Sequence, residues 1–148
     1  MRFYLIVMVV LLPSFAYTQA TDSVWCFGDG AKINFKNGIN IDTSSVNSRG
    51  SCVSVCDSAG QLSFYVSNTT LGILGWIEHP SRVYNRNDTS MLNGDSIVGL
   101  AWYKEYVIVN NPMHNNQFIV FCAGVTTSEG LYYSLVDMTQ DSGRGAVV

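Results

Sequence analysis

The stretch CVSVCDSAGQLSFYVS, residues 52–67, decides the fold class of this chain. Apolar and polar side chains alternate on both sides of the segment DSAG, which is the period of a β-strand. Asp suits the first position of a turn, and Gly suits a position that needs a positive φ. The sequence therefore predicts a β-hairpin here, with residues 53 and 55 on one face of its first strand and residues 52, 54 and 56 on the other. On its second strand, Leu62, Phe64 and Val66 share one face.

More strands are predicted further along the chain. Residues 106–109 and 117–122 are apolar runs around a polar loop that contains proline, which predicts a second hairpin. Its nearly continuous hydrophobicity implies burial on both faces. Residues 131–137 alternate again and precede a loop at Ser142-Gly143. Shorter strand candidates are residues 23–27, 33–35, 82–84 and 97–103. No window has a helical period, so the chain is predicted to be all-β.

Composition and charge exclude several classes of protein. The 148 residues are about enough for one domain, and 47% of them are hydrophobic while 13% are charged. This balance predicts a packed core and excludes intrinsic disorder. The net charge of −3 offers no basic field that would attract nucleic acid or anionic lipid.

The first twenty residues have the features of an export signal. Arg2 precedes the apolar run 3–12, which is about half the length needed to span a bilayer and matches the apolar region of a secretory leader. Two sites with small residues predict cleavage after Ala16 or Ala20. We therefore expect residues 1–20 to be a signal peptide, residues 21–148 to be the exported domain, and no membrane span beyond the leader; the alternative is an uncleaved anchor.

Four cysteines are compatible with disulfides in an oxidising compartment. Three full pairings are open to Cys26, Cys52, Cys56 and Cys122, and the sequence does not choose among them. Cys52 and Cys56 lack the second ligand pair of a zinc site, and His79 and His114 stand alone. We expect half-buried strand cysteines and no metal.

The sequence contains no catalytic or cofactor-binding motif. The nucleophile elbow, the phosphate loop and the paired-histidine zinc motif are all missing from it, so we expect neither catalytic residues nor a cofactor. Trp76 and Trp102 are the candidate ligand-binding residues, because aromatic rings pack on the apolar faces of sugars. The alternative is that these rings fill the β core.

Four segments resemble, in order and spacing, the N-terminal region of a family of large exported surface proteins of Bacteroidetes-type bacteria. They are WCFGDGA (25–31) followed by Phe35, CVSVCDSAGQLSFY (52–65), VYNRN with MLNG (83–87 and 91–94), and GLYYSLVDMT (130–139). The family opens with W-Y-F-G-x-G-A and continues with C-A-T-I-S-D-S-N-G-N-L-L-F-Y and G-L-Y-Y-S-x-V-D-M-T. This chain departs from it at residues 69–79, a longer apolar insert, and at residues 97–104, which lack a polar segment.

The resemblance implies a β-propeller-like region at the cell surface or outer envelope. Family members often continue into immunoglobulin-like repeats and a gliding-motility-associated or type IX secretion sorting domain. A blade takes about 40 to 50 residues and a ring needs at least about four blades, so residues 21–148 supply two to three. We expect an incomplete, open propeller whose remainder is missing; the alternative is a small β-sandwich that closes on itself.

Three functions follow as hypotheses. The first is a non-catalytic, exported interaction or adhesion module of the cell surface, the N-terminal part of a larger protein, with an envelope protein or a glycan as partner. The second is a secreted, glycan-active propeller enzyme that uses Glu78 or Glu129, for which two carboxylates about 5 to 10 Å apart are required. The third is a truncated remnant without activity.

Overall fold

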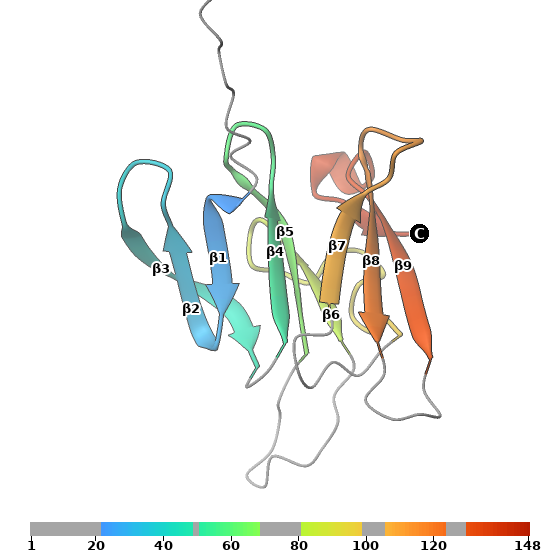
Figure 1. The fold of residues 1–148 in the computed structure, drawn as a ribbon, viewed down its shortest axis with the longest axis horizontal. Coiled ribbons are helices and arrows are strands. Elements are labelled where there is room, and N and C mark those ends of the chain that lie inside the picture. The colour runs from blue at the N-terminus through green and yellow to red at the C-terminus, as the bar shows by residue number, and fades with distance from the viewer. Residues whose placement is uncertain (1–21, 49–50, 69–80, 99–105, 124–129) are drawn as a thin grey trace, which may run out of the picture.

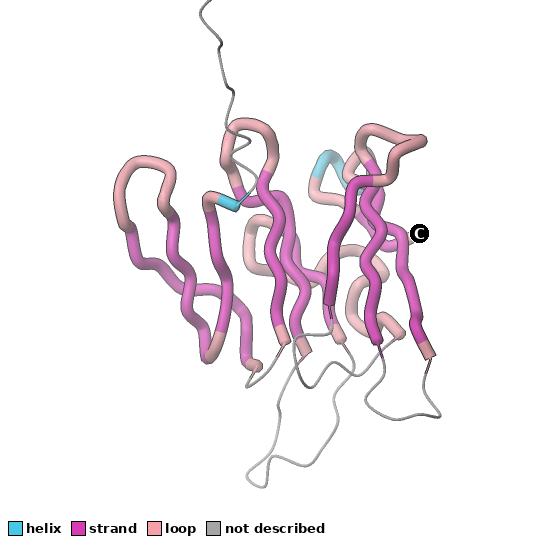
Figure 2. Tube along the Cα trace, in the orientation of Figure 1, coloured by secondary structure: helices cyan, strands magenta, loops and turns pink. Residues whose placement is uncertain are grey.

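The computed structural model describes residues 22–48, 51–68, 81–98, 106–123 and 130–148. Over these ranges ten strands form three antiparallel sheets (Figures 1 and 2). The all-β prediction is therefore confirmed. The leader and the residues Trp76, Glu78, His79, Trp102 and Glu129 lie outside the described ranges. Within those ranges, no helix has the length and apolar character that a membrane span requires.

The sheets follow one another in chain order. The first contains β1 (Val24–Phe27), β2 (Asp29–Asn34) and β3 (Asn40–Asn47). The second contains β4 (Cys52–Cys56), β5 (Leu62–Ser67) and β6 (Arg82–Asn85). The third contains β7 (Tyr106–Asn110), β8 (Gln117–Ala123), β9 (Leu131–Asp137) and β10 (Ala146–Val147). In each sheet, neighbouring strands in the chain are also neighbours in space.

The first strands of the sheets stand side by side. β1 contacts β4, and β4 contacts β7. From this central row, the first sheet spreads toward β3 on one side of the molecule and the third sheet spreads toward β9 on the other, with β5 and β6 behind (Figure 1). Within the described residues, no sheet closes on itself.

The hairpin at residues 52–67 forms as predicted. Asp57 Oδ1 accepts the N–H groups of Ala59 and Gln61, each at 2.9 Å, and Gly60 has φ +72°. This arrangement closes the turn, because glycine has no Cβ to oppose a positive φ. Val53 and Val55 pack toward the third sheet, as expected from the alternation.

Leu62 corrects part of this prediction. A register shift leaves Ser63 as an extra residue in β5, so Cys56 pairs with Leu62 while Val55 pairs with Phe64. Such a bulge turns the residues beyond it onto the other face. Leu62 therefore packs toward the first sheet, whereas Phe64 and Val66 pack toward the third.

The second hairpin and the strand at 131–137 are confirmed as β7, β8 and β9, but the expectation of burial on both faces is wrong. Tyr106, Val120 and Cys122 are buried on the inner face. On the opposite face Val107 is 54% exposed and Tyr133 is 67% exposed. The inner face has another sheet against it, and in the described residues no element covers the outer one.

Four further strand predictions have mixed outcomes. Residues 23–27 and 82–84 correspond to β1 and β6, whereas the strand expected at 33–35 begins earlier, at Asp29. Ile97 forms a single bridge with Ser81, and residues 99–103 lie outside the described ranges. β3 and β10 were not predicted. Ser142-Gly143 lies in a short 3-10 turn, Asp141–Gly143, after β9.

Two apolar clusters hold the row of sheets together. The larger lies between the second and third sheets and includes Phe64, Met91 and Val120. The rings of Phe64 and Phe118 meet edge to face across this interface, with centroids 5.2 Å apart. The smaller cluster lies between the first and second sheets and includes Cys26, Val46 and Tyr65.

We expect Phe64→Ala to destabilise the chain strongly. Phe64 is fully buried, so its truncation removes the contact with Phe118 and leaves a cavity, which costs about 3–5 kcal/mol. Urea unfolding followed by circular dichroism measures the loss. Met113→Ala is the control, because Met113 is 81% exposed and its truncation should change the free energy of unfolding by less than about 0.5 kcal/mol. Equal effects of the two changes would contradict this core.

Candidate functional site: a groove between the second and third sheets

A groove of about 1120 Å³ opens where the second and third sheets meet. Its floor is apolar and combines Val53 and Val55 of β4 with Ile108 of β7, Phe118 of β8 and Met138. These side chains come from strands that pack against each other, so the floor is part of the core between the two sheets.

Polar residues form the rim of the groove. They come from five segments: the start of the described chain, the turn of the first hairpin, the segment after β6, the loop between β7 and β8, and the segment before β10. In chain order the rim residues are Asp22, Asp57, Ser58, Arg86, Asn110, Asn111, Asn115, Asn116 and Gly143. Most of these side chains are neutral amides or hydroxyls, which both donate and accept hydrogen bonds.

The β7–β8 loop is held in shape by its own side chains. Asn111 Nδ2 donates to Gln117 Oε1 at 3.1 Å, and Met113 N donates to Asn111 Oδ1 at 3.0 Å. Gln117 Nε2 in turn donates to Asp137 Oδ2 at 3.1 Å, which ties the loop to β9. The Asn111 side chain therefore holds the loop in shape, whereas Asn115 and Asn116 are exposed on the loop.

Two of the three charged side chains at the described rim, Asp57 and Arg86, have structural partners. The carboxylate of Asp57 is used in closing its turn. The Arg86 guanidinium donates to the carbonyl of Gly143, so it connects the second sheet to the segment before β10. Asp137 lies behind the loop and accepts hydrogen bonds from Thr139, which together with Gln117 lower the pKa of its carboxyl group. The groove therefore suits a neutral polar ligand better than an ionic one.

A second polar group lies away from the groove, between the first and second sheets. Asp88 has a left-handed φ of 59° and accepts the Tyr65 hydroxyl at 3.0 Å and Lys32 Nζ at 2.8 Å. Tyr65 also accepts the N–H of Ser45 at 2.9 Å. Burial lowers the pKa of Lys32, but the hydrogen bond and charge of Asp88 outweigh it and raise that pKa. This group ties β2, β3 and β5 together, which is a structural role.

The cysteines are buried or half-buried on strands, as predicted. Cys26, Cys52 and Cys56 share the core between the first and second sheets, whereas Cys122 belongs to the other cluster. No disulfide joins the four, all of which lie in the described ranges. Burial raises the pKa of the Cys26 thiol to about 12, which disfavours the nucleophilic thiolate. These positions therefore serve packing.

None of the described residues that line this groove was predicted as a ligand residue. Trp76 and Trp102 lie outside the described ranges, so their part in binding stays a prediction. The groove residues were missed because the asparagines of NNPMHNN, residues 110–116, are typical of a solvated turn. The presence of four asparagines in one loop was the sequence signal that could have indicated this site. His114 is exposed in this loop, and among the described residues no three His, Cys, Asp or Glu gather as a metal site.

Comparison with known proteins identifies no relative: no protein-family model, no curated protein and no solved structure matches the chain. The resemblance to exported surface proteins therefore stays a prediction.

We expect Tyr65→Phe to destabilise the chain and to weaken its response to alkaline pH. The change leaves Ser45 N–H and Asp88 without the hydroxyl, at a cost of about 1–3 kcal/mol. Burial, first among the causes, raises the pKa of Tyr65 above its ordinary value. The parent's stability is therefore fully present below about pH 10, where unfolded tyrosine ionises, and falls as pH rises above it.

Urea unfolding at a series of pH values above neutrality tests this expectation. The free energy of unfolding should fall less steeply above about pH 10 in Tyr65→Phe than in the parent, because the variant lacks the titrating group. The control is Tyr132→Phe, which removes a tyrosine hydroxyl on β9 that takes no part in this hydrogen-bonded group. Identical slopes in Tyr65→Phe and the parent would show that the buried hydroxyl does not contribute.

Proposed function

We propose that this chain is a non-catalytic interaction module of the cell surface that binds a neutral glycan in the groove between its second and third sheets. The observation that carries the proposal is the groove itself, with an apolar floor and a rim of amides and hydroxyls. Export is supported by the signal-like leader at residues 1–20, and a surface location by the resemblance to exported envelope proteins.

The proposed scaffold is propeller-like. Each sheet is a meander in chain order, the first strands form a central row, and an apolar cluster fills each space between successive sheets. Propeller blades are built in this way around a central channel. A rigid scaffold of this kind holds loops in fixed positions, and such loops commonly carry the binding residues.

The composition of the groove favours a glycan. Sugar hydroxyls both donate and accept hydrogen bonds, as do the side-chain amides of Asn110, Asn115 and Asn116. The apolar C–H face of a sugar ring can lie on the floor beside Phe118. The volume is slightly larger than the range of about 300–1,000 Å³ that is common for small-molecule pockets, which suits an oligosaccharide.

The glycan-active enzyme is the alternative. Its candidate acids, Glu78 and Glu129, lie outside the described ranges. Among the described residues, the carboxylates that line the groove are Asp22 and Asp57, and Asp57 is occupied by its turn. A pair of carboxylates in reach of one glycosidic bond is what glycoside hydrolysis requires. Formation of new reducing ends from any tested glycan would therefore contradict the non-catalytic part of the proposal.

We expect the double variant Asn115→Ala, Asn116→Ala to lose glycan binding. A panel of neutral bacterial surface polysaccharides is first tested on the purified chain by an array, and the best binder is then titrated by calorimetry. Removing two amides from the rim should weaken binding at least about fivefold, because each hydrogen bond contributes about 0.5–1.5 kcal/mol. Both side chains are exposed, so the fold should be unchanged.

Asn37→Ala is the matched control, because Asn37 is exposed in the turn before β3 and does not line the groove. Its affinity should equal that of the parent. Equal affinity of the double variant and the parent would place the glycan elsewhere, and the absence of binding across the panel would overturn the choice of a neutral glycan.

A further inference from the structure

The outer face of the third sheet is apolar across its width. Two rows of cross-strand neighbours build it: Val107, Phe121 and Tyr133 form one row, and Val109, Ile119 and Leu135 form the other. Val107 is 54% exposed and Tyr133 is 67% exposed, while alternate residues such as Val120 and Val136 are buried on the inner face. We call this surface the third-sheet face.

The first sheet carries a second surface of this kind, and it is rich in aromatic rings. Trp25, Ile33 and Ile41 are cross-strand neighbours in β1, β2 and β3, and the Trp25 ring meets the Phe35 ring edge to face at 5.2 Å. Trp25 is 53% exposed and Ile41 is 83% exposed. We call the surface made by Trp25, Phe27, Ile33, Phe35 and Ile41 the first-sheet face.

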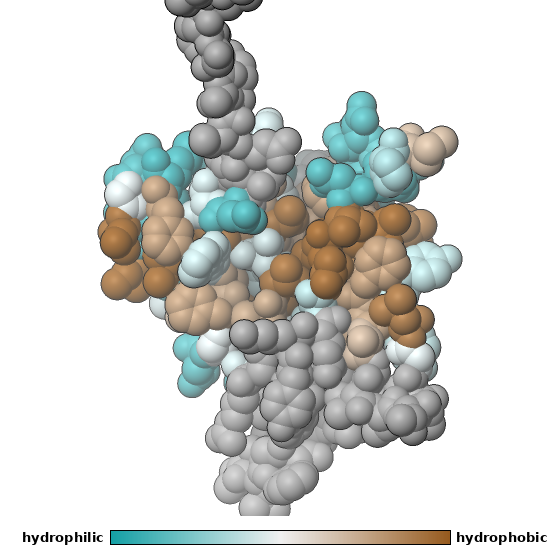
Figure 3. Space-filling model, viewed as in Figure 1, coloured by the Kyte–Doolittle hydropathy of each residue, from teal (hydrophilic) through white to brown (hydrophobic). Residues whose placement is uncertain are grey.

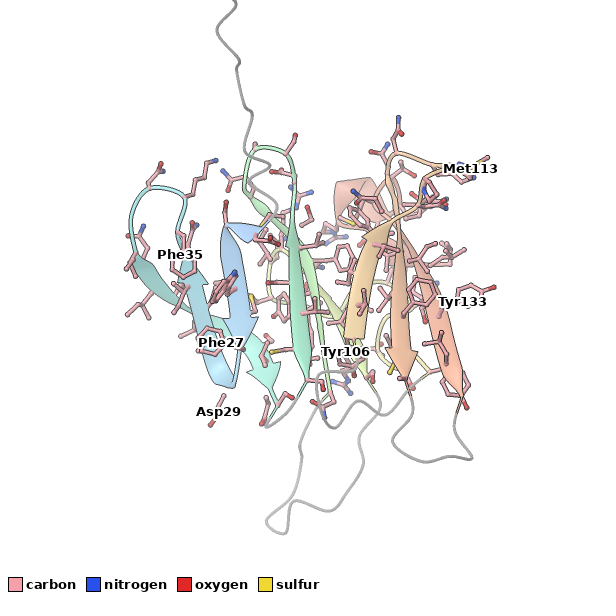
Figure 4. All side chains as sticks on the ribbon, viewed as in Figure 1. Phe27, Asp29, Phe35, Tyr106, Met113 and Tyr133 are labelled. Carbon is pink, nitrogen blue, oxygen red and sulfur yellow. The ribbon has the colours of Figure 1, made fainter. Side chains whose placement is uncertain are left out.

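The two faces are turned toward the same side of the molecule. The first and third sheets spread in opposite directions from the row of β1, β4 and β7 (Figure 1). In the same view, Phe27 and Phe35 lie on one side of that row and Tyr133 lies on the other (Figure 4). Apolar surface is visible on both sides (Figure 3). The described sheets therefore form an open half-ring whose two ends face the same way.

The interface between the second and third sheets indicates what fits each face. Each sheet has one surface toward the following sheet in the chain and one surface toward the preceding sheet. Val53, Val55 and Phe64 lie on the surface of the second sheet that is turned toward the third. That surface packs on the surface of the third sheet that carries Phe118. The third-sheet face is the surface on which a following sheet would pack, and it is rich in valine and isoleucine. The first-sheet face is the surface on which a preceding sheet would pack, and it carries aromatic rings. One chain thus supplies both halves of the same kind of contact.

We propose that a second copy of this chain covers both faces, with the third-sheet face of each copy packed on the first-sheet face of the other. The proposal uses the propeller-like row of sheets from the proposed function but not the glycan groove. Two half-rings related by a two-fold axis parallel to β1, β4 and β7 close a ring of six sheets, within the four to eight blades of known propellers. Closure leaves neither face exposed, and large exposed apolar patches mark interaction sites.

The area of contact reaches the lower limit for a specific interface. A face of three strands about 4.8 Å apart and about six residues long, at about 3.3 Å per residue, covers about 280 Å². The closed pair buries four such faces, about 1,100 Å² in footprint, which exceeds the value of about 1,000 Å² that marks a specific interface. The side chains named for the two faces carry no charge, so their burial incurs no cost of desolvating ions.

Sedimentation equilibrium of the purified chain and of two face variants tests the proposal. The parent should have twice the mass of one polypeptide measured under denaturing conditions. Trp25→Asp spoils the first-sheet face and Tyr133→Asp spoils the third-sheet face, and either change alone breaks both contacts of the ring. Each variant should therefore sediment as a single copy. An equimolar mixture keeps one contact between intact faces, so at equal total concentration it should contain more of the two-copy species than either variant alone.

A control variant and a check of folding accompany this test. Met113→Asp introduces the same charge at a residue that is 81% exposed and outside both faces, and it should remain a pair. Circular dichroism must match the parent for every variant; if Trp25→Asp fails this check, Ile41→Asp replaces it. A single-copy parent at all attainable concentrations would overturn the proposal and leave the faces to other occupants.

Two further outcomes would contradict the head-to-tail arrangement. Dissociation by one face variant alone, with the other still paired, would indicate a contact between like faces. A mixture that contains no more of the two-copy species than either variant alone would show that the two faces do not recognise each other. None of these outcomes depends on glycan binding, so failure of the pair and failure of the proposed function are distinguishable.

Discussion

Apolar character on both faces of a sheet is the constraint on which this structure depends. Side chains alternate along a strand, so a strand with few polar residues gives its sheet two faces that both avoid water. The second sheet meets this constraint completely, because Val53, Phe64 and Val66 pack on the third sheet while Cys56 and Tyr65 pack on the first. The row of sheets, the groove and the two open faces all follow from this arrangement.

Polar ties fix the order of the row. Asp88 accepts Lys32 and Tyr65 at the interface between the first and second sheets, and Arg86 donates to Gly143 at the interface between the second and third. Apolar packing is not directional, whereas hydrogen bonds are. These contacts from neighbouring residues after β6 therefore determine how each outer sheet sits against the middle one. They also leave the rim of the groove nearly free of unpaired charge.

Much of the fold could be predicted from the sequence, because hairpin signals are local. The turn at Asp57–Gly60 and the loop between β7 and β8 mark two hairpins by residue type alone. β3 escaped prediction because most of its residues are polar and exposed, so it lacks the alternation that indicates a half-buried strand. The face of Leu62 could not be predicted either, since a bulge depends on pairing between strands.

The candidate site was harder to predict than the fold. Its floor and rim come from segments far apart in the sequence, and no local motif joins Val55 to Phe118 or Asn115. The apolar runs of β7 and β8 led to the wrong expectation of burial on both faces, because sequence does not say which element covers each face. In the described residues one face is covered and the other is open, as at the end of an open row of sheets.

Small-angle X-ray scattering of the purified chain tests whether the sheets form a half-ring that a second copy completes. A completed ring gives the distance distribution of a compact, closed particle containing two copies, with the scattering minimum of a ring-like shape. A profile that fits one open row of sheets, with the forward intensity of a single copy, would contradict it.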